Sequence, residues 1–208
     1  MSSELLRFGA GDARVTQREV GYQGFFRLVR LTLEHRLFGG GWSPPFTREV
    51  FERGDAVAVL PWDPVRDELV LVEQFRAGAI RNQESPWMLE LIAGIVEADE
   101  DDEAVAHREA AEEAGCVMDR LESIATFYPS AGACSEQIRL FIGRVVSAGI
   151  GEVHGCDHEQ EDLLVHAVPR AHALNLVDED RINNGHTLIA LQWLARHGDA
   201  LRERWLKT

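Results

Sequence analysis

Acidic side chains recur at helical spacing in the middle of the chain, between Gly94 and Cys116. Glu109, Glu112 and Glu113 lie three and four residues apart, so a helix through them would place their carboxylates along one side. Like charges at that spacing destabilise a helix unless a positive charge lies between them. A hard divalent cation that prefers oxygen ligands, such as Mg²⁺, would supply that charge. The spacing therefore favours a metal site, with a solvated acidic helix as the alternative.

The predicted helix has features that would define its ends and the face that it buries. Acidic residues at positions 99–102 precede it, and negative charge suits the start of a helix dipole. Gly115 follows, where a left-handed residue commonly ends a helix. Three alanines spaced by four leave one face without side-chain bulk: Ala106, Ala110 and Ala114. We expect this face to pack closely against a neighbour while the acidic side faces a cleft.

A second acidic group stands just before a predicted strand. Its members are Asp157, Glu159, Glu161 and Asp162. An exposed acidic loop is the simplest interpretation. Metal-assisted hydrolysis, however, also needs a base for the attacking water or a carboxylate for a further metal ion. The residues leave open which of Asp157, Glu159 and Glu161 would serve as the base.

Several arginines could bind an anion. Arg76 closes a predicted strand, and its planar guanidinium could contact a phosphate through two nitrogens. An ordinary surface arginine at a strand end is the alternative. Arg48 and Arg53 flank a segment boundary and could bind a phosphate in the same way. Arg108 lies inside the acidic helix, four residues before Glu112, and is expected to orient the carboxylates by salt bridges.

The first part of the chain predicts a small antiparallel sheet. Residues 26–34 alternate between apolar and polar types, with a phase slip at Leu28–Val29 that suggests a bulge. Glycines and prolines then mark a turn, and residues 47–51 could return as a further strand. A sheet of this size is too small to bury a core of its own. It could dock on the rest of the chain or pair with a second copy.

The rest of the chain mixes strands and helices. Strands are predicted at residues 56–60, 69–75, 87–92, 123–127, 138–146 and 163–168. Helices are predicted at residues 169–177 and 184–197, with residues 201–206 as an extension. This order indicates a mixed sheet between helices. The small-residue loop at 130–136 would let a ligand approach the backbone, or is a plain turn.

Composition limits the class of protein. The 208 residues suffice for one domain, or for one domain with a small appendage. The net charge of −14 argues against binding to a nucleic-acid backbone or to an anionic membrane surface. No apolar run is long enough to span a bilayer, and the N-terminus lacks the apolar core of a secretory signal. Three separated cysteines without metal-ligand spacing favour a cytoplasmic location.

The acidic helix also matches a known motif without a gap. Gly94 is followed after five residues by Glu100, and after seven more by the run 108–116. This pattern resembles the box of the Nudix hydrolases. From about Tyr22 onward, further stretches resemble the bacterial ADP-ribose pyrophosphatases of that family. They lie at residues 51–54, 62–76, 130–136, 154–166 and 190–197.

The resemblance implies a fold of the α/β class. A Nudix α/β/α sandwich with a mixed sheet would be preceded by a small antiparallel β domain. The β domain would span residues 1–52, serve dimerisation and be exchanged across a homodimer. The Nudix hydrolase domain would span residues 53–208.

The resemblance also implies a set of site residues. The metal ligands would be Glu109, Glu112, Glu113, Glu161 and the carbonyl of Ala93. Glu159 would be the base that activates water, and Arg76 would hold a phosphate. The nucleoside and phosphate pocket would include Phe25, Phe26, Arg48, Glu49, Arg53 and Ile95, partly from the partner subunit. Ser130 and Glu136 would contact the side of the terminal ribose.

The implied reaction is the Mg²⁺-dependent hydrolysis of ADP-ribose to AMP and ribose 5-phosphate. Two or three Mg²⁺ ions would take part, with Mn²⁺ as the alternative metal. Ala131 stands where the family commonly has a proline, and this departure bears on the preference for ADP-ribose. The closest rival is hydrolysis of another nucleotide sugar such as GDP-mannose. A non-catalytic nucleotide-sugar sensor and an acidic protein without a ligand are the rivals from other classes.

Overall fold

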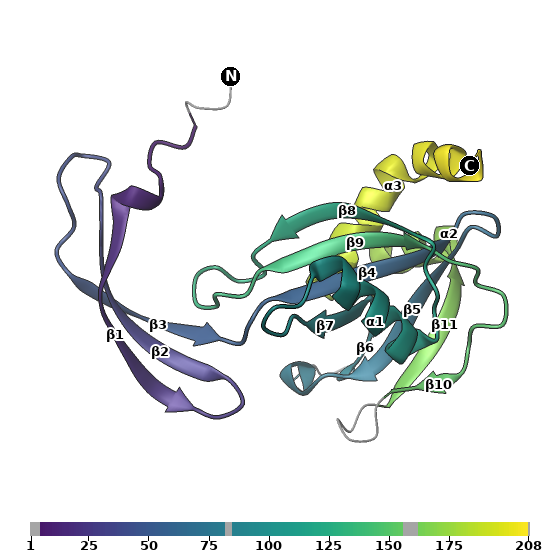
Figure 1. The fold of residues 1–208 in the computed structure, drawn as a ribbon, viewed down its shortest axis with the longest axis horizontal. Coiled ribbons are helices and arrows are strands. Elements are labelled where there is room, and N and C mark those ends of the chain that lie inside the picture. Colours follow the sequence, from purple (N-terminus) through teal and green to yellow (C-terminus); the bar gives the residue numbers. More distant parts are fainter. Residues whose placement is uncertain (1–4, 82–84, 156–161, 208) are drawn as a thin grey trace. The chain divides into compact units, whose positions relative to one another are not determined.

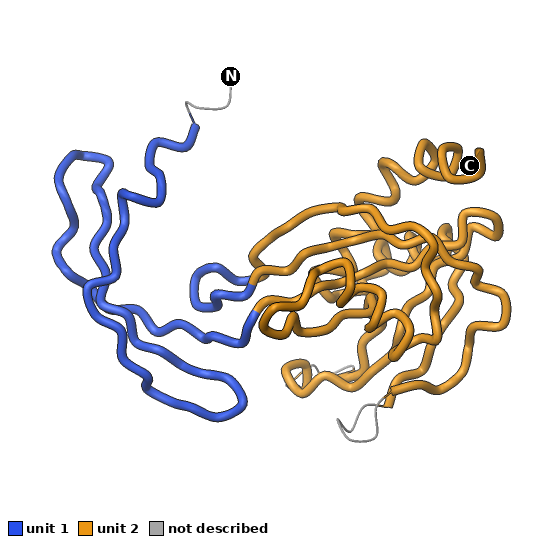
Figure 2. The backbone as a smooth tube through the Cα atoms, in the orientation of Figure 1, with its two compact units in different colours: residues 1–54, 130–136 blue, residues 55–129, 137–208 orange. Residues whose placement is uncertain are grey.

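The computed structural model describes residues 5–81, 85–155 and 162–207 of the chain. The chain forms two compact units, which are coloured separately in Figure 2. Unit 1 comprises Met1–Gly54 together with Ser130–Glu136. Unit 2 comprises Asp55–Pro129 and Gln137–Thr208. The loop that sequence patterns left as a ligand loop or a plain turn therefore belongs to the N-terminal unit.

Unit 1 is built on a three-stranded antiparallel sheet in the order β1-β2-β3 (Figure 1). A short 3₁₀ turn at Ala10–Asp12 leads into β1 (Ala13–Gln23), β2 (Arg27–His35) and β3 (Phe46–Glu52). In these three strands, all of which lie in the described part of the chain, only Val29 is buried. The small antiparallel sheet predicted at the N-terminus is confirmed, and it has almost no core of its own.

The predicted bulge is present, but its extra residue lies on the neighbouring strand. The β1–β2 register shifts between Val20 and Tyr22, which leaves Gly21 opposite Leu28–Val29. Glycine suits a bulge because it tolerates the local change in backbone direction. A second shift, between Val15 and Gln17, was not predicted.

Unit 2 contains an eight-stranded mixed sheet in the order β10-β11-β5-β4-β9-β8, with β6 paired to β5 and β7 paired to β4. The β4–β9 pair is parallel, and the other pairs are antiparallel. The strands are β4 (Ala56–Asp63), β5 (Glu68–Phe75), β6 (Trp87–Glu90), β7 (Ile92–Ile95), β8 (Arg120–Phe127), β9 (Ile138–Arg144), β10 (Val153–His154) and β11 (Leu163–Pro169). A 3₁₀ turn at Ala77–Ala79 follows β5.

Helices cover both faces of this sheet (Figure 1). Helix α1 (Asp102–Ala114) packs on one face, and α2 (Arg170–Asp178) and α3 (Gly185–Leu206) pack on the other. The sheet has a hydrophobic core on each face, and alternate side chains of β4 contribute to each. Val57 and Val59 face α1, while Ala58 and Leu60 face α3. The α/β/α sandwich with a mixed sheet is therefore confirmed.

One predicted strand is divided in two. Residues 87–92 were expected to form a single strand, but β6 pairs with β5 whereas β7 pairs with β4. Leu91 lies between them, and its amide donates to Oγ1 of Thr187 on α3, 3.1 Å away. That amide is therefore taken out of the strand ladder, and the chain passes from one neighbouring strand to another.

Helix α3 runs without a break for 22 residues, so residues 201–206 do extend it. Among the described residues, no helix is long and apolar enough to cross a membrane.

Candidate metal and substrate site

Helix α1 carries the acidic motif, and both of its ends are fixed locally. The Asp101 side chain accepts hydrogen bonds from the amides of Glu103 and Ala104, at 3.0 and 3.3 Å, and so caps the first turn. Gly115 ends the helix in the left-handed conformation, with φ 61°. The buried face carries the three alanines spaced by four: Ala106, Ala110 and Ala114. The predicted helix, its glycine stop and its small-residue face are all confirmed.

The small residues let α1 lie close to β7, and this brings two of the predicted ligands to that strand. A Cβ atom at Gly94 would lie 1.8 Å from Oε1 of Glu109, so only glycine leaves room for this carboxylate. Glu113 is buried, with 4% of its surface exposed, and its Oε2 lies 3.4 Å from the amide nitrogen of Ala93. Two box carboxylates therefore meet the backbone of Ala93–Gly94.

Arg108 holds the acidic residues of the motif, as the sequence predicted. Its Nη1 donates to Glu109 at 2.8 Å and to Glu112 at 3.2 Å, while Nε and Nη2 contact Glu100. Burial alone would lower the pKa of Arg108, but the bonds to Glu100 and the charges around it raise that pKa. The pKa of Glu100 is lowered by its bond from the Glu97 amide and then by Arg108. The guanidinium thus neutralises negative charge that would otherwise repel along the helix.

These residues fit a divalent cation by the chemistry of their donors. The carboxylates of Glu109, Glu112 and Glu113 and the carbonyl of Ala93 are hard oxygen ligands. Within the described ranges, no three acidic, histidine or cysteine side chains are already gathered closely enough to hold an ion. Glu109 and Glu112 are directed at Arg108 instead. Ion binding would therefore require these two carboxylates to exchange part of their contact with Arg108. The predicted Glu159 and Glu161 lie outside the described residues.

Arg76 follows β5 and is held by a residue that the sequence patterns did not single out. Its Nε donates to Oε2 of Glu90 at 2.8 Å, and Glu90 is completely buried. Glu90 also accepts from Nδ2 of Asn184, at 2.7 Å, and from Nε2 of Gln74, at 3.4 Å. The sequence did contain a signal for this role. Glu90 stands in an otherwise apolar strand, and a buried carboxylate requires hydrogen-bond partners. Ile95, at the end of β7, is half-buried.

A second group of predicted residues gathers within unit 1. The ring of Phe26 lies edge-on to those of Phe25 and Phe51, with centroids 4.8 and 5.3 Å away. The Arg53 guanidinium lies 5.4 Å from the centre of the Phe26 ring, and its Nε is 3.4 Å from Glu136, which is buried. Aromatic faces beside an arginine can accept a flat base and an anion. Phe51 joins this aromatic–arginine cluster although the sequence patterns did not select it.

Other residues predicted for the same pocket lie apart from these contacts. Arg48 stacks over Phe46, 4.7 Å from the ring centre, and lies on the opposite face of β3 from Glu49. Ser130 is exposed, and its carbonyl accepts from the amides of Ala133 and Cys134 in a turn. Glu49 shares a face of β3 with Phe51 and is exposed.

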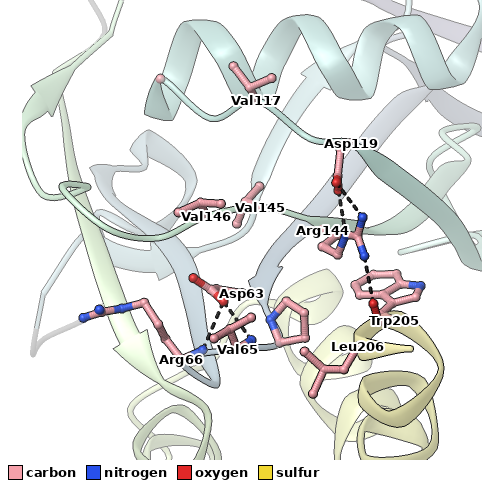
Figure 3. A pocket seen from close by; sticks show the side chains of 12 residues that line it. Asp63, Val65, Arg66, Val117, Asp119, Arg144, Val145, Val146, Trp205 and Leu206 are labelled. Carbon is pink, nitrogen blue, oxygen red and sulfur yellow. Dashed lines mark hydrogen bonds and ion pairs between the residues drawn. The ribbon is translucent and has the colours of Figure 1, made fainter. Parts of the chain in front are cut away.

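Unit 2 also has a hollow of about 970 Å³ that involves none of the predicted site residues (Figure 3). Its charged groups are already paired. Arg144 contacts Asp119 at 2.6 and 2.7 Å, and Arg66 contacts Glu68 at 2.7 Å. Burial would raise the pKa of Asp63, but hydrogen bonds from the amides of Ser147, Arg66 and Val65 outweigh it and lower the pKa. Within the described residues, the two arginines that line the hollow are thus each paired with a carboxylate.

The fold and the motif on α1 together define a class of protein. The NUDIX domain model matches residues 52–190, and the chain belongs to this family of hydrolases.

The chain is similar over nearly its whole length to curated proteins named ADP-ribose pyrophosphatase. It is 44% identical to the one from Escherichia coli strain K12 over 198 residues, covering 95% of each chain. It is 42% identical to the one from Haemophilus influenzae over 209 residues, covering 99% of this chain and 96% of the relative. A protein named GDP-mannose pyrophosphatase, from Citrobacter koseri, is 30% identical over 148 residues and covers 71% of this chain.

A solved structure described as an ADP compounds hydrolase has the same fold. It aligns with a TM-score of 0.66 over 90% of this chain and 96% of its own length. At 20% sequence identity, this likeness concerns the fold alone.

Proposed function

We propose that this protein hydrolyses the pyrophosphate bond of ADP-ribose, giving AMP and ribose 5-phosphate. The observation that carries the proposal is the meeting of Glu109 and Glu113 with the backbone of Ala93–Gly94, which brings two carboxylates of α1 to one short stretch of β7. The choice of substrate is supported by identities of 44% and 42% to ADP-ribose pyrophosphatases, against 30% to a GDP-mannose pyrophosphatase.

The metal is Mg²⁺, in two or three ions, with Mn²⁺ as the alternative. Its ligands are Glu109, Glu112, Glu113, Glu161 and the carbonyl of Ala93. Bound divalent cations supply positive charge to the pyrophosphate oxygens and make a water molecule easier to deprotonate. Arg108 keeps the carboxylates of Glu109 and Glu112 together on one side of α1.

The chain's own side chains carry the remaining roles. Glu159 takes the proton from the attacking water. The terminal nitrogens of Arg76 bind a substrate phosphate and stabilise the charge that develops on it. Phe25, Phe26 and Arg53 form one wall of the nucleoside pocket, since they already lie together in unit 1. Glu136 positions Arg53 through their contact at 3.4 Å.

The active form is a homodimer in which the N-terminal β domain, residues 1–52, contacts a second copy. The exposure of β1 along all 11 of its residues supports this, because apolar Val15, Val20 and Tyr22 are among them.

The protein acts in the cytoplasm. The described cysteines, Cys116 and Cys134, are free thiols, which is typical of a reducing compartment.

The test is turnover of a panel of ADP-ribose, GDP-mannose, NADH and diadenosine polyphosphates with Mg²⁺, and again with EDTA. We expect ADP-ribose to give the highest kcat/KM, with AMP and ribose 5-phosphate as products, and EDTA to abolish the reaction. A higher kcat/KM for GDP-mannose would overturn the substrate assignment. Binding of ADP-ribose without turnover would identify the protein as a sensor instead.

A further inference from the structure

Glu90 is a buried carboxylate that receives three hydrogen bonds from two separate parts of unit 2, the end of β5 and the start of α3. Arg76 follows β5, Gln74 lies within β5, and Asn184 precedes α3. The shortest contacts are 2.8 Å from Arg76 Nε to Oε2 and 2.7 Å from Asn184 Nδ2 to Oε1. A charge that is completely buried is retained only where such partners satisfy it. Glu90 therefore fixes the relative positions of Arg76 and the start of α3.

The contact to Glu90 uses only one corner of the Arg76 guanidinium. Among residues 5–81, 85–155 and 162–207, no hydrogen bond to Nη1 or Nη2 of Arg76 is present, and 40% of the side chain is exposed. A guanidinium that is held through Nε can present its two terminal nitrogens to one phosphate. As far as the described residues go, Glu90 therefore leaves both terminal nitrogens of Arg76 able to donate to an anion.

Asn184 has a fixed orientation because its two amide atoms have different partners. Oδ1 caps α3 by accepting from the amide and the hydroxyl of Thr187, at 3.3 and 3.1 Å. Nδ2 is consequently turned toward Glu90. The same Thr187 hydroxyl accepts from the amide of Leu91, at 3.1 Å. The start of α3 therefore contacts two consecutive residues, Glu90 and Leu91, and the chain continues from these directly into Ala93–Gly94.

We propose that Asn184 and Glu90 are positioning residues that orient Arg76 toward a phosphate of the substrate. The contacts lead from Asn184, the cap of α3, through the buried Glu90 to the partly exposed Arg76 side chain. It ties the angle of Arg76 to the same segment that carries the Ala93 carbonyl. This inference rests on the proposed function, in which Arg76 contacts the substrate.

The test is a double-mutant cycle between Asn184 and Arg76. Asn184→Asp keeps an oxygen to cap α3 but replaces the donor to Glu90 with a repelling oxygen. In the otherwise wild-type protein we expect kcat/KM for ADP-ribose to fall about tenfold, as for the loss of a hydrogen bond to a charged group. In an Arg76→Ala background the same substitution should change kcat/KM less than about twofold, because there is no guanidinium to misplace. If Arg76→Ala does not fold, Arg76→Gln, which also removes the cation, takes its place with the same expectation.

A matched control lies at the other end of α3. Glu122 accepts from Nε1 of Trp205, at 2.7 Å, and from Arg204, so Glu122→Gln also weakens an arginine–carboxylate contact on this helix. It should lower the Tm without changing kcat/KM more than about twofold.

The outcomes separate the two proposals. Equal losses of kcat/KM from Asn184→Asp in both backgrounds would show a general structural effect and would overturn the positioning role alone. A loss from Glu122→Gln as large as that from Asn184→Asp would do the same. If the wild-type protein hydrolyses no nucleotide sugar, both the proposed function and this inference fail.

Discussion

The carboxylate of Glu109 lies directly over Gly94, so closely that a Cβ at that position would be 1.8 Å from Oε1. Gly94 belongs to β7 and Glu109 to α1, so this is a close contact between helix and strand at the proposed site. Position 94 needs glycine because a larger residue would overlap Glu109. Position 115 favours glycine for another reason, the left-handed backbone conformation that ends α1.

Gly94→Ala should therefore affect activity more than stability. The new methyl group would overlap Oε1, Cδ and Cγ of Glu109, at 1.8, 2.1 and 2.6 Å, so this side chain must rotate away, at a cost of about 1–2 kcal/mol. A displaced metal ligand should reduce kcat by about ten- to a hundredfold. Steady-state kinetics and urea denaturation would measure both effects. Gly39→Ala, where nothing lies within 4 Å of the added carbon, is the control. Wild-type kcat in Gly94→Ala would mean that Glu109 is not needed where it lies.

The contacts of Arg108 predict that the effect of replacing it on the Tm depends on metal. Arg108→Gln removes the charge between Glu109 and Glu112, so their carboxylates repel unless a cation replaces the guanidinium. We expect the Tm to fall by about 3 °C in EDTA and by clearly less in excess Mg²⁺. Lys207→Gln, which removes an exposed pair with Glu203, should show no such metal dependence. Equal losses of Tm for Arg108→Gln with and without Mg²⁺ would contradict a metal site at these carboxylates.

The residues that sequence patterns located best are those whose partners are near in the chain. Arg108 and Glu112 are four residues apart, and Gly115 ends its helix through local backbone geometry, so both could be inferred from spacing alone. The pair Glu90 and Asn184 is 94 residues apart and depends on where α3 begins over the sheet. No local period encodes that contact.

The same limit explains the errors in the strands. The residues 87–92 look like one strand because all but Glu90 are apolar. They are separated at Leu91, whose amide bonds to α3 while the chain passes from β5 to β4 as its partner strand. The bulge near Leu28–Val29 was visible as a change of phase, yet the phase of β2 could not show that the extra residue is Gly21 on β1. Such features depend on which strands pair and in what register, and the sequence of one segment does not specify either.

Glu113 offers the most direct test of the metal ligands. It is buried, and Glu113→Gln keeps its shape and an oxygen that can accept from the Ala93 amide. We expect kcat to fall about a hundredfold or more while the Tm is not reduced, because the change removes ligand charge and not packing. Glu103→Gln, an exposed change in the first turn of α1, should leave kcat unaltered. Near-normal turnover in Glu113→Gln would refute its role as a metal ligand.

The hydrogen bonds of Asp63 predict how the stability of the folded protein depends on pH. It is buried and accepts from the amides of Val65, Arg66 and Ser147 and from the Ser147 hydroxyl. Burial opposes its charge, but these bonds outweigh burial, so the folded-state pKa lies below the ordinary 3.8. A depressed carboxyl pKa stabilises the folded protein above the unfolded-state value, and that stabilisation is lost as the pH falls through the folded-state value.

Asp63→Asn should accordingly lower the free energy of unfolding by about 1–3 kcal/mol at neutral pH. Its cost relative to wild type should shrink as the pH falls below 3.8, because the wild-type carboxyl then becomes protonated. Urea denaturation of both proteins across this range measures the difference. Asp178→Asn, at the exposed end of α2, provides a carboxyl control with little effect at any pH. A constant difference between Asp63→Asn and wild type would mean that the bonds to Asp63 do not stabilise its charged form.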